Sequence, residues 1–211
     1  MFLAETLTAL TEGLKRTFTT DYPVEDFAGP RMVGVSIEYP IEAVSYPAVW
    51  VGFEPVGNLS NVGIGHTEVV TVEVDGEERF GEVSVWRFEG RSLFTIMTQT
   101  SLNRARLMDE VTRVIAFGHL EEGRGAFRQY LIDQDLIRIQ LNYDEISITG
   151  MAETPGTPWG TDDIVYEVTL SVDTIGEFAS TPFGQFVPLS AIKVIPIEEG
   201  TPDPTTPGGW I

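Results

Sequence analysis

The chain has 211 residues, enough for one domain with a substantial core, and 13 basic against 32 acidic side chains give it a formal net charge of −19. This charge argues against a surface that grips nucleic acid or an anionic membrane, because both require Lys and Arg to contact phosphate groups. Without cysteine the chain has no disulfide or thiolate metal site, and none of its apolar stretches approaches the roughly 18 residues of a transmembrane helix.

The first expected element is an amphipathic helix over residues 2–19, in which apolar side chains recur at spacings of three and four. Those side chains are Phe2, Leu3, Leu7, Leu10, Leu14 and Phe18. The polar side of this helix is not basic, so we expect it to pack on a sheet rather than lie on a membrane. Glu5 stands where a signal peptide would be basic, and we therefore expect the protein to remain where it is made.

Residues 19–31 contain prolines and a glycine, which predicts a connecting loop. A short strand is expected over 33–37, and a second strand over 46–55, where prolines stand near both ends. Residues 54–66 are rich in Gly, Asn and Ser, which predicts a surface loop.

A β-hairpin is expected next. The β-branched run at 69–74 is followed by Asp75 and Gly76, a strong signal for a tight turn, and then by a second strand over 80–88.

The stretch 82–118 contains the clearest change of hydrophobic period. Two strands are expected there, separated by a break at Gly90, and the second of them is apolar on both faces at 93–97. Thr100 and Ser101 are natural helix caps, and apolar residues from Leu107 onward then recur at helical spacing.

The last third is expected to hold a short helical turn at 127–134 and strands at 136–142 and 164–172, with 146–148 also extended. Between them, the proline and glycine residues of 150–163 predict a long loop.

These elements predict an α+β domain over residues 1–179: a mixed, mostly antiparallel sheet with an N-terminal helix and a central helix packed on it, plus a hairpin. Residues 180–211 are rich in proline and glycine, and we expect them to form an extended C-terminal arm, except for a short strand at 191–197.

Few residues suggest chemistry. His66 and His119 have no neighbour at ligand spacing, so no metal site is expected. The pairs Asp144-Glu145 and Asp162-Asp163 could in principle serve a hydrolase, although such pairs usually lie in solvated turns. We expect no cofactor and no enzymatic activity.

The order of these elements resembles the tail terminator proteins of long-tailed bacteriophages, also called tail completion or tail-to-head joining proteins. The segments YPAVWVGFEP at 46–55 and DIVYEVTLSV at 163–172 resemble them most. The resemblance implies a structural protein of the virion, assembled in the host cytoplasm into a homo-oligomeric, six-fold ring. Such a ring caps the last ring of the tail tube, meets the head connector proteins, and lets double-stranded DNA pass through its lumen without specific binding.

Two expectations follow for a ring of this kind. An acidic bore would repel DNA during passage, and the candidate residues for it are Asp144, Glu145, Asp162 and Asp163. The arm carries apolar side chains that need burial, which suggests contacts with a neighbouring subunit through Phe183, Phe186, Ile195, Ile197 and Trp210.

Three alternatives remain open at the level of sequence. The chain could be another ring component of the same virion, such as a head-completion adaptor or a distal tail protein. It could instead be a β-rich ligand-binding module that uses Trp50, Trp86 or Trp159 as a stacking platform. The third alternative is the hydrolase built on the acidic pairs.

Overall fold

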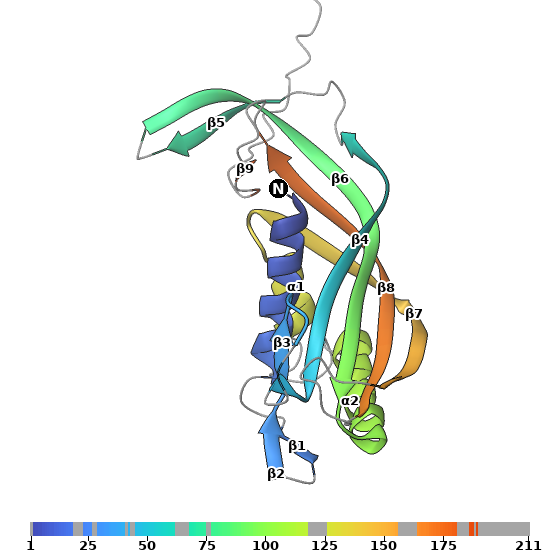
Figure 1. The fold of residues 1–211 in the computed structure, drawn as a ribbon. Coiled ribbons are helices and arrows are strands. Elements are labelled where there is room, and N and C mark those ends of the chain that lie inside the picture. The colour runs from blue at the N-terminus through green and yellow to red at the C-terminus, as the bar shows by residue number, and fades with distance from the viewer. Residues whose placement is uncertain are drawn as a thin grey trace, which may run out of the picture.

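A computed structural model describes residues 2–18, 23–26, 29–40, 42, 45–61, 68–74, 77–117, 126–155, 164–180, 186–187 and 189. Over these residues the protein has an α+β fold in which helices pack on a mixed sheet, as the sequence predicts (Figure 1). No helix in this part of the chain is long and apolar enough to cross a membrane.

The helices are α1 (Phe2–Phe18), α2 (Ser101–Phe117) and α3 (Ala126–Ile132). The strands of the main sheet are β3 (Gly34–Ser36), β4 (Ala48–Asn61), β5 (Glu68–Val74), β6 (Glu77–Thr98), β7 (Ile137–Pro155), β8 (Ile164–Ser180) and β9 (Phe186–Val187). The main path across the sheet is β3-β4-β6-β8-β7, in which only β3 and β4 run parallel. β5 pairs with the beginning of β6, and β9 pairs with the end of β8.

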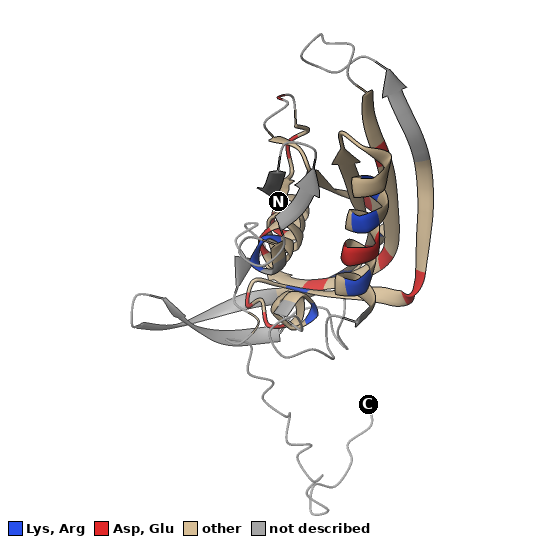
Figure 2. Cartoon of the chain, turned by 90° about the horizontal axis from the view of Figure 1, so that it is seen from below, with Lys and Arg blue, Asp and Glu red and all other residues tan. Residues whose placement is uncertain are grey.

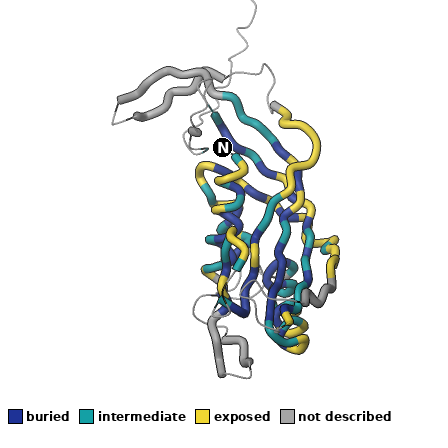
Figure 3. The backbone as a smooth tube through the Cα atoms, in the orientation of Figure 1, coloured by how far each residue is buried: buried dark blue, intermediate teal, exposed yellow. Residues whose placement is uncertain are grey.

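One hydrophobic core lies between the sheet and the three helices. α1 buries Leu10, Leu14 and Phe18, and α3 buries Phe127, whose ring meets Phe94 of β6 edge-on at 6.2 Å between centroids. α2 adds the apolar stripe expected from its sequence: Leu107, Val111, Val114 and Ile115. Because residues of all three helices belong to one cluster, the helices cover the same face of the sheet (Figures 1 and 3).

The start of α2 confirms the predicted cap. The backbone N–H of Asn103 donates to the hydroxyl of Thr100 over 3.2 Å, which satisfies one of the free donors of the first helical turn. The hydroxyl of Thr98 in turn donates to the carbonyl of Thr100, over 2.8 Å. The strand-to-helix transition is thus fixed by short-range hydrogen bonds.

Three of the loops expected from the sequence, at 19–31, 54–66 and 150–163, are strand in part. In the first of these, two short strands pair antiparallel, β1 (Pro23–Asp26) and β2 (Gly29–Met32), with Pro30 opposite Glu25. β4 continues through 54–61, and β7 continues through 150–155. The extension of β4 pairs with β6, and that of β7 pairs with β8, in both cases beyond a shift of register. The local composition of these segments does not indicate that a partner strand lies beside them.

The expected break at Gly90 is also wrong, because β6 runs without interruption from Glu77 to Thr98. A Cβ atom at Gly90 would lie 2.3 Å from the ring of Phe53 and 2.6 Å from the carbonyl oxygen of Glu54. Glycine is therefore required here for the close approach of β4 rather than for a turn.

A second glycine accommodates an aromatic ring in the same region. Gly176 of β8 stands opposite Phe88 of β6, and a Cβ atom there would lie 2.0 Å from the Phe88 ring. Phe88 is buried among the rings of Phe2, Phe53 and Phe178, at centroid distances of 5.0, 5.7 and 6.2 Å. These four rings close the upper end of the core against the N-terminus of α1.

Candidate functional site

The sheet face opposite the helices carries mostly polar side chains, and we call it the open face. Alternation along the strands places Glu54 of β4, Arg91 and Leu93 of β6, and Ser171 and Asp173 of β8 on it. At one end the open face is covered locally, because Tyr46 packs there on Met97 and Val165 in a small buried cluster. Elsewhere the open face is exposed at Glu54, Arg91 and Asp173.

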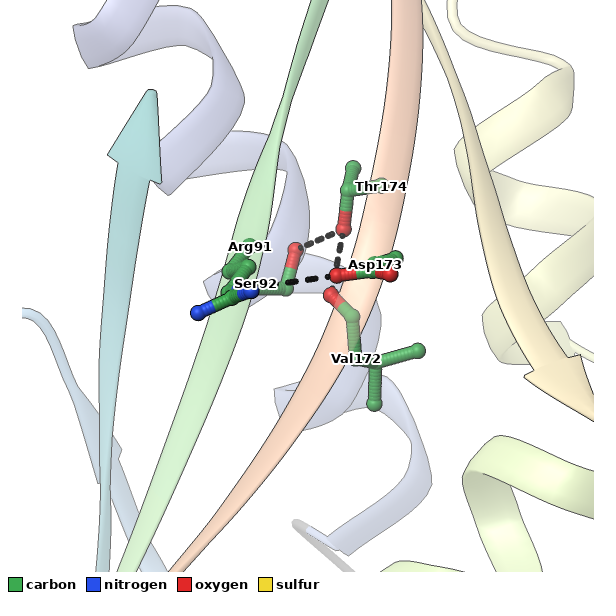
Figure 4. Close-up of polar contacts among 5 residues, drawn as sticks. All are labelled: Arg91, Ser92, Val172, Asp173 and Thr174. Atoms are coloured by element: carbon green, nitrogen blue, oxygen red, sulfur yellow. Dashed lines mark hydrogen bonds and ion pairs between the residues drawn. The ribbon is translucent and has the colours of Figure 1, made fainter. Parts of the chain in front are cut away.

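Figure 4 shows the two faces of the sheet at one place. On the open face the guanidinium Nε of Arg91 donates to Oδ1 of Asp173 over 3.3 Å, and both side chains are more than half exposed. On the helix side the hydroxyls of Ser92 and Thr174 are 2.7 Å apart and fully buried, and Thr174 also donates to the carbonyl of Val172. Exposed pairs of this kind add little stability, whereas a buried hydroxyl pair is costly to break.

We expect the Thr174→Val substitution to lower the free energy of unfolding by about 1–3 kcal/mol, because it leaves the buried Ser92 hydroxyl without its partner. The double variant Ser92→Ala with Thr174→Val should recover part of this loss, since neither polar group then remains. Urea denaturation of the single and double variants measures both values. A double variant that is no more stable than the Thr174→Val variant would contradict this account.

A shallow hollow of about 420 Å³ lies on the open face around the ion pair. It is lined by the carboxylates of Glu54, Asp173 and Glu145, by Arg91, and by a group of hydroxyls. The hydroxyls belong to Ser147, Thr149, Thr169 and Ser171. Arg91 is the only basic side chain among these lining residues, and it already contacts Asp173, so the hollow has an excess of negative charge.

The excess of acid extends over the whole open face. Six carboxylates of described residues occupy outward positions on its strands: Glu54, Glu89, Glu145, Glu167, Asp173 and Glu177. Three guanidinium groups accompany them: Arg87, Arg91 and Arg138. Figure 2 shows acidic positions along the strands and several basic ones on the helices. The open face is thus net negative, in keeping with the whole chain.

An aromatic group forms one end of the open face. The indole N–H of Trp50 donates to the carbonyl of Ile37 over 2.8 Å, and the ring of Tyr39 meets Trp50 edge-on at 5.8 Å. The hydroxyl of Tyr39 donates to Oε1 of Glu167 over 2.6 Å. Partial burial and the adjacent carboxylate of Glu167 raise the pKa of Tyr39 above its usual value. Burial and the same carboxylate also raise the pKa of Tyr46, whose hydroxyl donates to the carbonyl of Pro40.

These raised pKa values predict a loss of stability in alkali. The folded protein holds the two tyrosine protons more tightly than the unfolded chain does. Their contribution to the free energy of unfolding is therefore fully present below pH about 10 and is lost as the pH rises further. Urea unfolding between about pH 9 and about pH 11 should show a falling stability. The Tyr39→Phe variant should show a smaller fall, and an unchanged slope in that variant would contradict the assignment.

Of the three tryptophans considered from the sequence as a stacking platform, the structure describes two. Trp50 lies on the open face, 36% exposed, whereas Trp86 packs against the core on the helix side. Trp159 lies outside the described residues. The two described tryptophans therefore lie on opposite faces, and a platform formed by Trp50 or Trp159 stays a prediction.

The acidic pairs predicted for a lumen are only partly described. Asp144 and Glu145 are exposed and lie where the register of β7 shifts against β8, between Leu141 and Ile146. β7 bends in its middle part (Figure 1). The structure brings Glu145, but not Asp144, to the hollow with Glu54 and Asp173.

Other predicted residues cannot be placed. Asp162 and Asp163 lie outside the described residues, as do both histidines and, in the arm, Phe183, Ile195, Ile197 and Trp210. Phe186 is described through its backbone alone, in β9. The predicted subunit contacts of the arm therefore stay predictions.

Sequence reasoning missed Glu54, Arg91 and Asp173. Each stands alone among apolar or small neighbours, and only the strand register places them in one row across β4, β6 and β8. Alternation within each strand indicates that these residues share the polar face, but it does not show which ones stand opposite each other.

No protein-family model matches the chain, and no curated protein matches it in sequence. Among the described residues, no group of three or more acidic or histidine side chains is placed to hold a metal ion. What the open face offers is an extended, net negative surface with hydroxyl groups.

Proposed function

We propose that the protein is a structural component of a bacteriophage virion, a ring that terminates the tail tube and joins it to the head connector. The observation that supports the proposal most is the acidic open face, since a one-sided sheet leaves a broad polar surface free for a role other than core formation. The homo-oligomeric, six-fold ring comes from the resemblance in the order of the elements.

The physical role of the acidic surface follows from electrostatics. Double-stranded DNA carries one negative charge per roughly 1.7 Å of its axis, so a wall of carboxylates repels it and keeps it from adhering. At physiological salt this repulsion is screened over about 8 Å, and only groups at the wall of the bore contribute to it. In this proposal Asp144 and Glu145, exposed on β7, lie at that wall.

Electron microscopy of the purified protein, alone and mixed with tail tubes, tests the proposal. We expect rings, and rings placed at the head-proximal end of the tube. Rings at the opposite end would instead indicate a distal tail protein, and a protein that remains monomeric beside the tubes would overturn the proposal.

Charge reversal tests the placement of the acidic residues. In the variant Asp144→Lys with Glu145→Lys, the bore would attract DNA, and we expect rings to retain linear DNA at least about tenfold more tightly at low salt. The measurement is filter binding of DNA over a range of salt concentrations. A control variant, Glu38→Lys with Glu42→Lys, has the same change of charge at exposed positions off the strands and should bind less DNA. Equal retention by both variants would contradict the placement at the bore without affecting the ring.

A further inference from the structure

The end of the sheet where β6 leads into α2 carries two exposed surfaces of opposite charge (Figure 1). One surface, which we call the aromatic corner, is formed by Tyr39, Trp50 and Glu167 on the open face. The other is formed by the first two turns of α2, residues 101–108, on the helix side. Because the sheet lies between them, the two surfaces of one molecule cannot meet.

The aromatic corner is suited to a cation. The rings of Tyr39 and Trp50 stand at 72° to each other and are 38% and 36% exposed, so both are accessible. The carboxylate of Glu167 uses one oxygen to accept from the Tyr39 hydroxyl, and its other oxygen can accept further hydrogen bonds. The segments that bear these side chains, 33–61 and 164–180, contain no Lys or Arg. Such a site favours a guanidinium group, which can stack on a ring and pair with a carboxylate at the same time.

The first two turns of α2 carry the opposite charge. Residues 101–108 include Arg104 and Arg106 and no acidic residue, and Asp109 is the first acid of the helix. Arg104 already lies over a tyrosine ring of its own chain, at 5.5 Å from the ring centroid. Arg106 is exposed and has no ion pair with a described residue. Leu102 precedes it by four residues, on the same side of the helix, and is 59% exposed, more than any other large apolar side chain that the structure describes.

We propose that the aromatic corner binds the start of α2 from a second copy of this chain. Arg106 of that copy stacks on Trp50 and pairs with Glu167, and Leu102 covers apolar surface of the rings. Trp, Tyr and Arg are the residue types that most often dominate the binding energy of protein interfaces. A second copy is favoured over another protein because the chain itself supplies both complementary surfaces, and only another molecule can bring them together.

The contact is head-to-tail, since it joins different surfaces of two identical molecules. Repetition of such a contact produces either a closed ring or an open filament. The inference therefore rests on the proposed function for closure into a ring, and it adds the contact that holds neighbouring subunits together. Asp144 and Glu145, proposed for the bore, take no part in this contact.

Reversing the charge of Arg106 tests the contact. In the full-length chain we expect Arg106→Glu to weaken self-association at least about tenfold, measured by sedimentation velocity over a range of protein concentrations. The matched control is Arg138→Glu, which makes the same change of net charge at another exposed position. Arg138 pairs in register with Glu177, ten residues along β8 from Glu167 or roughly 33 Å away, so this control should leave self-association unchanged.

A second variant tests whether the two charges face each other. Glu167→Arg alone should also weaken self-association, whereas Glu167→Arg combined with Arg106→Glu exchanges the charges and should recover most of the affinity. Circular dichroism checks that each variant is folded. Equal losses in Arg106→Glu and Arg138→Glu, or no recovery in the folded double variant, would overturn the contact. Rings that form unchanged in Arg106→Glu would overturn the contact and leave the ring standing. A chain that stays monomeric in every form, even beside tail tubes, would overturn both.

Discussion

The Gly176→Ala substitution is expected to destabilise the protein by about 3 kcal/mol or more. The added methyl group would lie 2.0 Å from the Phe88 ring, well inside contact distance. Phe88 has little room to move, because it is buried against Phe2, Phe53 and Phe178. β8 cannot shift either, since it is hydrogen-bonded to β6 on one side and to β7 on the other.

Urea or thermal denaturation measures this loss, and the chain provides a matched control. Gly52 is also a strand glycine, but a methyl group there would meet Leu93 at 3.5 Å, an ordinary contact distance. Gly52→Ala should therefore change stability by less than about 1 kcal/mol. The double variant Gly176→Ala with Phe88→Leu should recover part of the loss. If both alanine variants were equally stable, the close packing of Phe88 on Gly176 would be refuted.

The Phe94→Ala substitution is expected to lower the free energy of unfolding by about 3–5 kcal/mol. Phe94 is fully buried and contacts the ring of Phe127, so its removal leaves a cavity between the sheet and α3. The cost of this cavity adds to the lost transfer free energy of the side chain, because the surrounding strands and helices relax only partly into it.

Its neighbour Leu93 provides the comparison, because it points to the opposite face of the same strand. Leu93 is half-buried on the open face, and we expect Leu93→Ala to cost less than about 1.5 kcal/mol. Chemical denaturation of the two variants side by side gives both values. Similar losses for the two would mean that the open face is as closely packed as the core, which would exclude its role as a free surface.

Much of the fold could be predicted from the sequence because the decisive signals are local. The helical spacing of apolar residues predicts α1 and α2, and Thr100 caps α2 as expected. Asp75 and Gly76 predict a hairpin, and β5 and β6 pair antiparallel as expected, with Val74 opposite Glu77. The errors arise where a residue has a tertiary role: Gly90 resembles a turn residue in sequence, yet it lies under Phe53.

The candidate site was less predictable. Asp144 and Glu145 stand out because they are adjacent in sequence, but only Glu145 lies at the hollow. The row of Glu54, Arg91 and Asp173 depends on how three strands align, over sequence separations that no local pattern bridges.

The uninterrupted course of β6 has a mechanical consequence. This single strand of 22 residues joins the tip of the β5–β6 hairpin to the start of α2, a path of about 70 Å at roughly 3.3 Å per residue. From Ser84 to Thr98 it is hydrogen-bonded to β8, and for most of that length also to β4, so it has no hinge there. A force applied to the hairpin would therefore be transmitted along the strand to α2, so the two ends of β6 are mechanically coupled.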